Sequence, residues 1–203
     1  MKNFWSRQFL VLAMVASSFS LALPAVAADE RWALLVGVDK CANLGELKVC
    51  AADARSLQAV LEQAGYQGQV KVLADDGPDL SQWPTQSNLE RAIENLAKTA
   101  DAGDTILLFF SGHGLTRNGE GYLVPSDGDQ KRGLALAWVK DQLRASKARE
   151  KILILDACHA GTAKGVTGIV PDATASKDLV MLLSCDRDQV SWPDEAGGHS
   201  VFT

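Results

Sequence analysis

The segment that most constrains the fold is Lys151–Gly161, with the sequence KILILDACHAG. Its apolar run, Ile152–Leu155 led by Lys151, is typical of a strand buried on both faces, as in the centre of a parallel sheet. Open α/β sheets place their chemistry at the carboxyl ends of such strands. Cys158 follows there, two residues after Asp156, so its thiol is a candidate nucleophile. The alternative is a packed core thiol, because free cysteine is among the most commonly buried residue types.

A histidine follows an earlier apolar run in the same way. Asp104–Phe110, DTILLFF, predicts another buried strand, and His113 comes next between Gly112 and Gly114, where glycines let the backbone turn sharply. If the two strands are neighbours in a parallel sheet, they lie about 5 Å apart, and His113 and Cys158 emerge side by side. Histidine can serve as the base that turns a thiol into a nucleophilic thiolate. The pattern therefore indicates a Cys–His dyad.

Three motifs resemble those of the caspase-like cysteine peptidases, and most closely those of metacaspases and bacterial caspase-like proteins. They are SGHG after one strand, DACHAG after the next and LLSCDRDQVSW after a third. The resemblance runs from Trp32 to Thr203, and His113 precedes Cys158 by 45 residues, near the roughly fifty residues of animal caspases. Asp156 stands where the animal caspase signature has glutamine.

The resemblance implies a caspase-like three-layer α/β/α sandwich with a mostly parallel sheet of about six strands. The alternation of predicted strands and helices favours the same α/β class. The other expected strands are Arg31–Asp39, Val70–Ala74 and Asp178–Cys185; the expected helices are Val49–Gln63, one after a capping box at Ser87–Glu90, and Leu134–Ala145. Thr116–Gly121 is expected to be a loop, and Gly37 to permit close approach of another backbone.

The resemblance further implies a cysteine-type endopeptidase that acts through an acyl-enzyme and needs no cofactor. Cys158 would be the nucleophile and His113 the general base and acid. The backbone N–H groups of Gly114 and Cys158 would form the oxyanion hole. His159 is an alternative base, whereas His199 is expected to be a surface residue.

Metacaspases cleave after Arg or Lys, and the resemblance carries the acidic specificity pocket over to Asp156 and Asp53, with Cys50 and Ser111 lining it. Two carboxylates suit one guanidinium, whose planar fork of donors pairs with them at short range. Asp156 could instead accept hydrogen bonds from nearby backbone N–H groups, and Asp53 could be a solvated helix carboxylate. Trp192 could line the substrate groove or pack in the core.

Metal binding is not expected. Calcium-dependent metacaspases carry acidic residues after the histidine and again after the nucleophile, but the segments Leu115–Gly121 and Gly161–Gly168 contain only Glu120. A zinc site is disfavoured because the sequence has no C-x-x-C, and Cys158 and His159 are adjacent rather than spaced as ligands.

Residues 1–27 are expected to be a secretory signal peptide rather than part of the fold. Lys2 and Arg7 precede the apolar run Phe9–Leu23, and Ala25–Ala27 is a small-residue cleavage site. The caspase-like domain would then be 28–203, without its last C-terminal element, in an exported protein that is periplasmic or secreted and free of the membrane. An uncleaved anchor is the alternative.

Export makes the cysteines candidates for oxidation. Cys41 and Cys50 could pair across a short loop, which would compete with Cys50 as a pocket residue, while Cys185 would remain free or buried. Self-cleavage at Lys164, in the Gly/Thr/Ala-rich segment Gly161–Ser176, is a further hypothesis.

The charge of the chain limits its partners. The net charge of −5, which signal cleavage would change to −7, comes without a basic patch, so nucleic acid is not expected and a basic peptide or protein substrate is. Two alternatives to a peptidase stay open: a catalytically silent caspase-like domain that binds proteins, and a dyad hydrolase of non-protein amides or esters.

Overall fold

The computed structural model describes residues 29–41, 44–66, 69–159, 179–184, 193–194 and 199–200, with Cys158, His159 and the last two pairs described through the backbone alone. The expected signal peptide, Lys164, Cys185 and Trp192 lie outside these residues. None of the helices in the described ranges has the length and apolar character that a membrane span requires.

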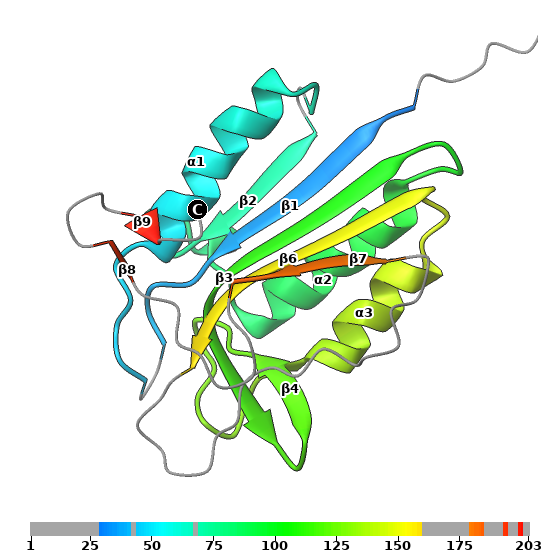
Figure 1. Ribbon diagram of the computed structural model, residues 1–203. Helices are drawn as coiled ribbons and strands as arrows, with labels where there is room; N and C mark the ends of the chain where they lie inside the picture. Colours follow the sequence, from blue (N-terminus) through cyan, green and yellow to red (C-terminus); the bar gives the residue numbers. More distant parts are fainter. Residues whose placement is uncertain are drawn as a thin grey trace, which may run out of the picture.

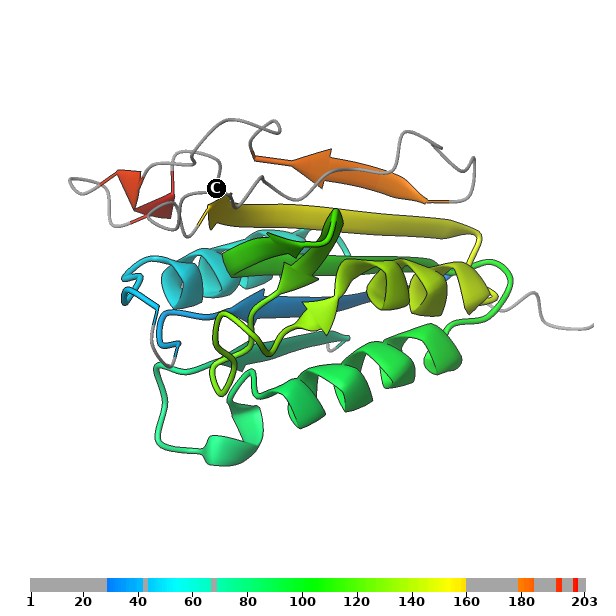
Figure 2. The same ribbon diagram turned by 90° about the horizontal axis from the view of Figure 1, so that it is seen from below.

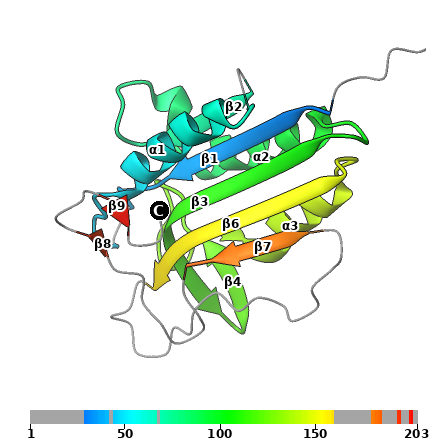
Figure 3. The same ribbon diagram turned by 45° about the horizontal axis from the view of Figure 1, so that its top comes forward.

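The described strands form a seven-stranded sheet, one more than the sequence predicts, and a separate two-stranded sheet of β8 (Pro193–Asp194) and β9 (His199–Ser200). Five strands of the large sheet are parallel, in the spatial order β2 (Val70–Ala74), β1 (Arg31–Gly37), β3 (Thr105–Arg117), β6 (Glu150–His159) and β7 (Val180–Leu183). Figure 3 shows β3 between β1 and β6. The expected mostly parallel sheet is confirmed.

Helices cover the sheet on both sides and give the expected α/β/α arrangement. α1 (Cys50–Gln63) lies over one face, and α2 (Gln86–Thr99) and α3 (Leu136–Ala145) over the other (Figures 1 and 2). A short 3₁₀ helix, η1 (Leu80–Gln82), precedes α2.

The core follows from the alternation of side chains along the central strands. In β3, Leu108 and Phe110 pack with α2 and α3, whereas Leu107 and Phe109 pack with α1. Successive side chains point to opposite faces of a strand, so a strand covered on both faces must be apolar at every position. The continuous apolar run in the sequence has this physical cause.

Gly37 permits close packing of α1 on β1, as predicted. A Cβ atom at Gly37 would lie 2.6 Å from Cα of Ala51 and would also collide with the carbonyl oxygen of Cys50. Both obstacles are backbone atoms of the first turn of α1, which cannot rotate away. The missing side chain therefore sets how closely the helix approaches the end of β1.

The strand that carries the histidine is longer than predicted. β3 does not turn at the glycines around His113; it continues to Arg117, and β6 likewise continues to His159. Gly112 has no positive φ, and a Cβ there would lie 3.1 Å from the Phe110 ring and from Cβ of Val38. The glycine thus serves tight packing rather than a turn.

The segment predicted as a loop at Thr116–Gly121 is a hairpin. The β3 extension pairs antiparallel with β4 (Glu120–Leu123), which pairs with β5 (Leu134–Ala135). Asn118 and Gly119 connect β3 and β4 with φ of 52° and 83°. Two successive positive φ values characterise the tight hairpin turn that Asn-Gly favours, a signal that the sequence interpretation missed.

Two helix starts also differ from prediction. The prediction of a capping box at Ser87–Glu90 is wrong. The N-cap of α2 is Thr85, whose Oγ1 accepts a hydrogen bond from the backbone N of Asn88 at 3.3 Å. The Asn88 side chain instead donates to the carbonyl oxygen of Trp83 at 2.8 Å. The helix α3 begins at Leu136, because Leu134–Ala135 pairs with β4 as β5.

Candidate active site

His113 and Cys158 occupy opposite positions on neighbouring strands. The parallel register of β3 and β6 runs from Thr105 opposite Glu150 to Gly114 opposite His159, and it sets His113 against Cys158. Neighbouring strands lie about 4.8 Å apart. The backbone thus brings the two candidate residues together, within the sheet rather than just beyond it.

Near this pair, one of the two strands that flank β3 is replaced by another. β1 accompanies β3 as far as the pairing of Gly37 with Ser111, and the backbone N of Val38 still donates to the Ser111 carbonyl oxygen at 2.9 Å. From Gly114 onward, β4 takes the place of β1 while β6 stays on the other side. His113 therefore lies where β1 departs, and the chain leaving β1 passes beside it.

The imidazole of His113 is held on one side by that departing chain. Its Nε2 lies 2.6 Å from the carbonyl oxygen of Gly45. A carbonyl can only accept, so Nε2 carries a hydrogen and the neutral ring has its lone pair on Nδ1. Nδ1 is buried and has no hydrogen-bond partner among the described residues.

The surroundings of His113 favour its neutral form. Its side chain is 5% exposed, and burial lowers its pKa, an effect that the hydrogen bond to Gly45 partly opposes. Burial disfavours the charged imidazolium. A neutral imidazole with a fixed tautomer and an unpaired basic nitrogen is suited to accept a proton at Nδ1.

The sequence interpretation gave Gly45 no role. The group that contacts His113 is a main-chain carbonyl. Since every residue type has one, no residue pattern marks it.

Three buried polar side chains gather beside the pair. Asp53, Ser111 and Asp156 are 0%, 1% and 2% exposed. Oγ of Ser111 lies 3.5 Å from Oδ2 of Asp53, which is long for a hydrogen bond, and Ser111 is opposite Asp156 in the β3–β6 register. The structure therefore brings the predicted pocket residues together. The alternative of a solvated carboxylate is wrong for Asp53.

Helix α1 supplies Asp53 from its first turn, and Cys50 begins the helix. Cys50 is buried and its thiol is hydrogen-bonded to the carboxylate of Asp39. Cys41 lies apart from it, with Sγ 3.6 Å from the carbonyl oxygen of Pro125. Neither thiol is part of a disulfide, so the alternative of a Cys41–Cys50 disulfide is wrong. Burial raises the pKa of Cys41 to about 12, with a further contribution from Asp75.

The amide of Gly114 faces away from β4. Gly114 is opposite Leu123 in the antiparallel register, and the backbone N of Val124 donates to the carbonyl oxygen of His113 at 2.9 Å. In this arrangement Gly114 and Leu123 form a pair without mutual hydrogen bonds. The N–H of Gly114 therefore points to the side of β3 on which β6 and Cys158 lie.

Among the residues that the structure describes, no group of three or more His, Cys, Asp or Glu side chains is arranged to hold a metal ion.

Comparison with known proteins assigns the fold and the family. Residues 30–203 match the caspase domain family. Protein GSU0716 from Geobacter sulfurreducens has a similar fold, with a TM-score of 0.63 at 19% identity over 85% of this chain and 78% of that one. The chain belongs to the caspase domain family.

Its curated relatives narrow this family to one branch. The chain is 34% identical over 150 residues to Metacaspase-1 of Mycosarcoma maydis, covering 66% of this chain and 36% of that protein. It is 30% identical over 174 residues to Metacaspase-1 of Scheffersomyces stipitis, covering 73% and 42% respectively. The predicted metacaspase-like affiliation is confirmed. The chain spans about two fifths of the length of these relatives.

Proposed function

We propose that this protein is a cysteine endopeptidase that cleaves after Arg or Lys through a dyad of Cys158 and His113. The observation that carries the proposal is the register of β3 and β6, which sets the two residues opposite each other. Support also comes from the fixed tautomer of His113, which leaves Nδ1 free among the described residues to take a proton.

In the first half of the reaction, Nδ1 of His113 takes the proton of the Cys158 thiol, and the thiolate sulfur attacks the carbonyl carbon of the scissile peptide. The carbonyl oxygen becomes an oxyanion, which the N–H groups of Gly114 and Cys158 stabilise. When the C–N bond breaks, the leaving amine takes the proton from Nδ1 and an acyl-enzyme remains.

In the second half, water attacks the thioester carbon while Nδ1 removes one of its protons. The C–S bond then breaks, the sulfur regains the proton, and the peptide acid leaves. Atoms and charge balance without a cofactor. We expect no calcium requirement, since Leu115–Gly121 and Gly161–Gly168 contain only Glu120 as an acidic residue.

The preference for a basic residue before the cut rests on Asp53 and Asp156. Both carboxylates are almost completely buried. Ser111 lies next to each of them: its Oγ is 3.5 Å from Asp53, and it is opposite Asp156 in the register of β3 and β6. A guanidinium or ammonium group of the substrate would pair with this buried negative charge. Cys50, at the start of the same helix, would line the pocket.

The test is hydrolysis of fluorogenic peptides that end in Arg, Lys or Asp, under reducing conditions, with calcium and with a chelator. We expect cleavage after Arg and Lys in both conditions, lost in Cys158→Ala and His113→Gln. Cys41→Ala is the matched control, because it removes a half-buried thiol with a raised pKa and should keep activity. Mass spectrometry after iodoacetamide treatment should show modification of Cys158 in the wild type.

Other outcomes would favour other functions. Cleavage after Asp alone would keep the dyad and reject the pocket roles of Asp53 and Asp156. Hydrolysis of small esters or amides without peptides would indicate a non-protein substrate, and a stable fold without hydrolysis would indicate a binding module. Comparing the intact masses of the wild type and Cys158→Ala tests self-cleavage at Lys164.

We also propose that the protein is exported, on the basis of the apolar and small-residue pattern of residues 1–27. N-terminal sequencing of protein recovered from a bacterial periplasm would support this with a start at Ala28. A start at Met1 in the membrane fraction would contradict it.

A further inference from the structure

Asp39 accepts hydrogen bonds from Leu47, near the end of the segment 40–48, and from the start of α1 that follows it. This segment passes beside His113. The carbonyl oxygen of Asp39 accepts a hydrogen bond from the backbone N of Leu47 at 2.8 Å. Its side chain reaches the start of α1, where Oδ1 accepts from the backbone N of Cys50 at 2.9 Å and Oδ2 from that of Ala51 at 3.4 Å. Asp39 thus ties the end of β1 to the first turn of α1, across the segment that contains Gly45.

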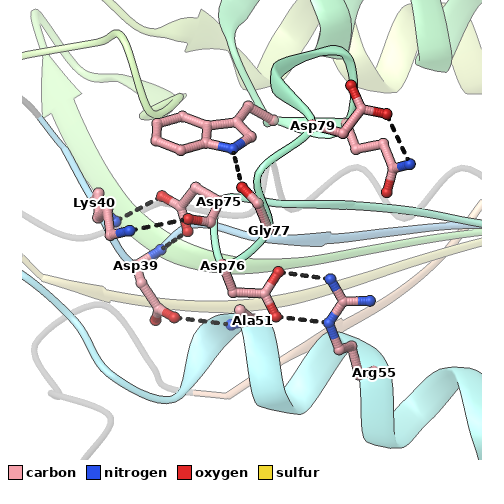
Figure 4. A network of polar contacts seen from close by, with 10 residues as sticks. Asp39, Lys40, Ala51, Arg55, Asp75, Asp76, Gly77 and Asp79 are labelled. Carbon is pink, nitrogen blue, oxygen red and sulfur yellow. Dashed lines mark hydrogen bonds and ion pairs between the residues drawn. The ribbon is translucent and has the colours of Figure 1, made fainter.

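The position of Asp39 is itself fixed by a buried carboxylate. Oδ1 of Asp75 accepts from the backbone N of Asp39 at 3.1 Å, and Oδ2 accepts from that of Lys40 at 2.7 Å. The Lys40 ammonium donates to the carbonyl oxygen of Asp75 at 3.1 Å and lies 5.4 Å from the centre of the Trp83 ring. Figure 4 shows these contacts between β2, the end of β1 and the start of α1.

Two groups of the proposed site lie in the parts of the chain that Asp39 holds together. The carbonyl of Gly45 lies within it and holds Nε2 of His113. Asp53 lies in the helix turn whose first N–H groups Asp39 caps, and the N–H of Asp53 bonds to the carbonyl oxygen of Val49 at 2.8 Å. Moving the Asp39 carboxylate would therefore displace both the partner of the base and one wall of the pocket.

We propose that Asp39 is a positioning residue, which aligns the Gly45 carbonyl with His113 and the first turn of α1 with Ser111 through one carboxylate. The inference rests on the proposed function for its effect on turnover. Its structural content is independent of that function: Asp39 determines which imidazole nitrogen of His113 carries the hydrogen.

The first test measures that tautomer in Asp39→Asn. The side-chain amide keeps one acceptor oxygen, but its NH₂ group would face donors at the start of α1 and oppose the present geometry. Long-range ¹H–¹⁵N spectra of the histidines at pH 8 report the tautomer, and His159→Gln and His199→Gln assign the signals. We expect the wild-type ring to be protonated at Nε2 and the Asp39→Asn ring to show a mixture of both tautomers.

Asp76→Asn is the matched control. Asp76 follows Asp75 and binds Arg55 of α1 with contacts of 2.6 and 2.7 Å. Among the described residues it makes no hydrogen bond to the segment 40–48, and its interaction with Lys40 is electrostatic only. Its loss removes one charge and one anchor of α1. A Nε2 tautomer retained in Asp76→Asn and lost in Asp39→Asn supports the proposal, whereas equal spectra in all three proteins overturn it.

A second variant tests the proposal independently, so that a folding defect in Asp39→Asn does not decide the result. Leu47→Pro removes the N–H that donates to Asp39 and leaves every carboxylate in place, and Leu47→Ala controls for the lost side chain. Tautomer mixing in Leu47→Pro but not in Leu47→Ala, with both proteins cooperatively folded, supports the proposal. A Nε2 tautomer retained in Leu47→Pro overturns the role of this closure.

Kinetics separates this inference from the proposed function. In an active peptidase, Asp39→Asn should lower kcat and raise KM for Arg peptides, with kcat/KM falling about 10- to 100-fold, as expected for misplaced catalytic groups. Unchanged kcat and KM would overturn the inference. If the wild type hydrolyses no peptide, the peptidase proposal fails, while the tautomer measurement still decides the role of Asp39.

Discussion

The carbonyl oxygen of Gly45 lies 2.6 Å from Nε2 of His113, although 68 residues separate them. The contact uses the main chain alone, and a Cβ added at Gly45 would meet no atom within 4 Å. We therefore predict that Gly45→Ala keeps kcat/KM within about twofold, since surface substitutions away from specific interactions have small effects. Peptide hydrolysis measures this, and a tenfold loss would show that the glycine itself is required.

The burial of His113 predicts how stability depends on pH. Its pKa is lowered in the folded protein, so the unfolded chain binds more protons than the folded one below about pH 6.5. The stabilisation from this group is present above pH 6.5 and is lost as pH falls through the lowered folded pKa. Urea unfolding between pH 8 and pH 5 should show this decrease, and His113→Gln should show a smaller one. Equal slopes in the two proteins would contradict the prediction.

The buried carboxylates predict a charge-specific defect. Asp53→Asn should lower kcat/KM for Arg peptides about 10- to 100-fold, in line with the loss of one hydrogen bond to a charged group. Peptides with uncharged norleucine before the cut should be affected much less. Asp79→Asn, on the exposed turn before α2, is the control for a lost negative charge. An equal defect with both kinds of peptide would indicate a role in folding instead.

The tight contact at Gly37 predicts that substituting this glycine destabilises the fold, whereas substituting Gly77 does not. Gly37→Ala should lower the free energy of unfolding by about 1–3 kcal/mol, because its Cβ collides with the backbone of α1. A Cβ at Gly77 would meet no atom within 4 Å, so Gly77→Ala should change the free energy by about 0.5 kcal/mol or less. Thermal and urea unfolding of both variants provide the comparison.

Much of the sheet could be predicted because central strands carry a strong signal. The runs at Asp104–Phe110 and Ile152–Leu155 are apolar at every position, since both faces of β3 and β6 are covered. The opposition of His113 and Cys158 followed from neighbouring parallel strands. What the sequence concealed was the continuation of both strands through polar and glycine residues, because pairing with β4 and β6 overrides local preference there.

The side chains of the site could be predicted from the sequence, whereas its main-chain groups could not. Asp53, Ser111 and Asp156 were found as residues, and the structure places them together. The carbonyl of Gly45 could not be found, because its role depends on where the backbone passes. The role of Asp39 was hidden for a related reason: its partners are the backbone N–H groups of Cys50 and Ala51, which no sequence pattern distinguishes.

The unbroken course of β3 has a consequence for control of the protein. The strand that forms the middle of the core also carries His113, so displacing the backbone of the histidine would require separating paired central strands, at a cost approaching global unfolding. A switch that acts at low energy must therefore work on the other contributors. The segment between β1 and α1 is such a contributor, because it reaches His113 through a single carbonyl. A change in this segment would alter the contact of the imidazole while leaving the sheet intact.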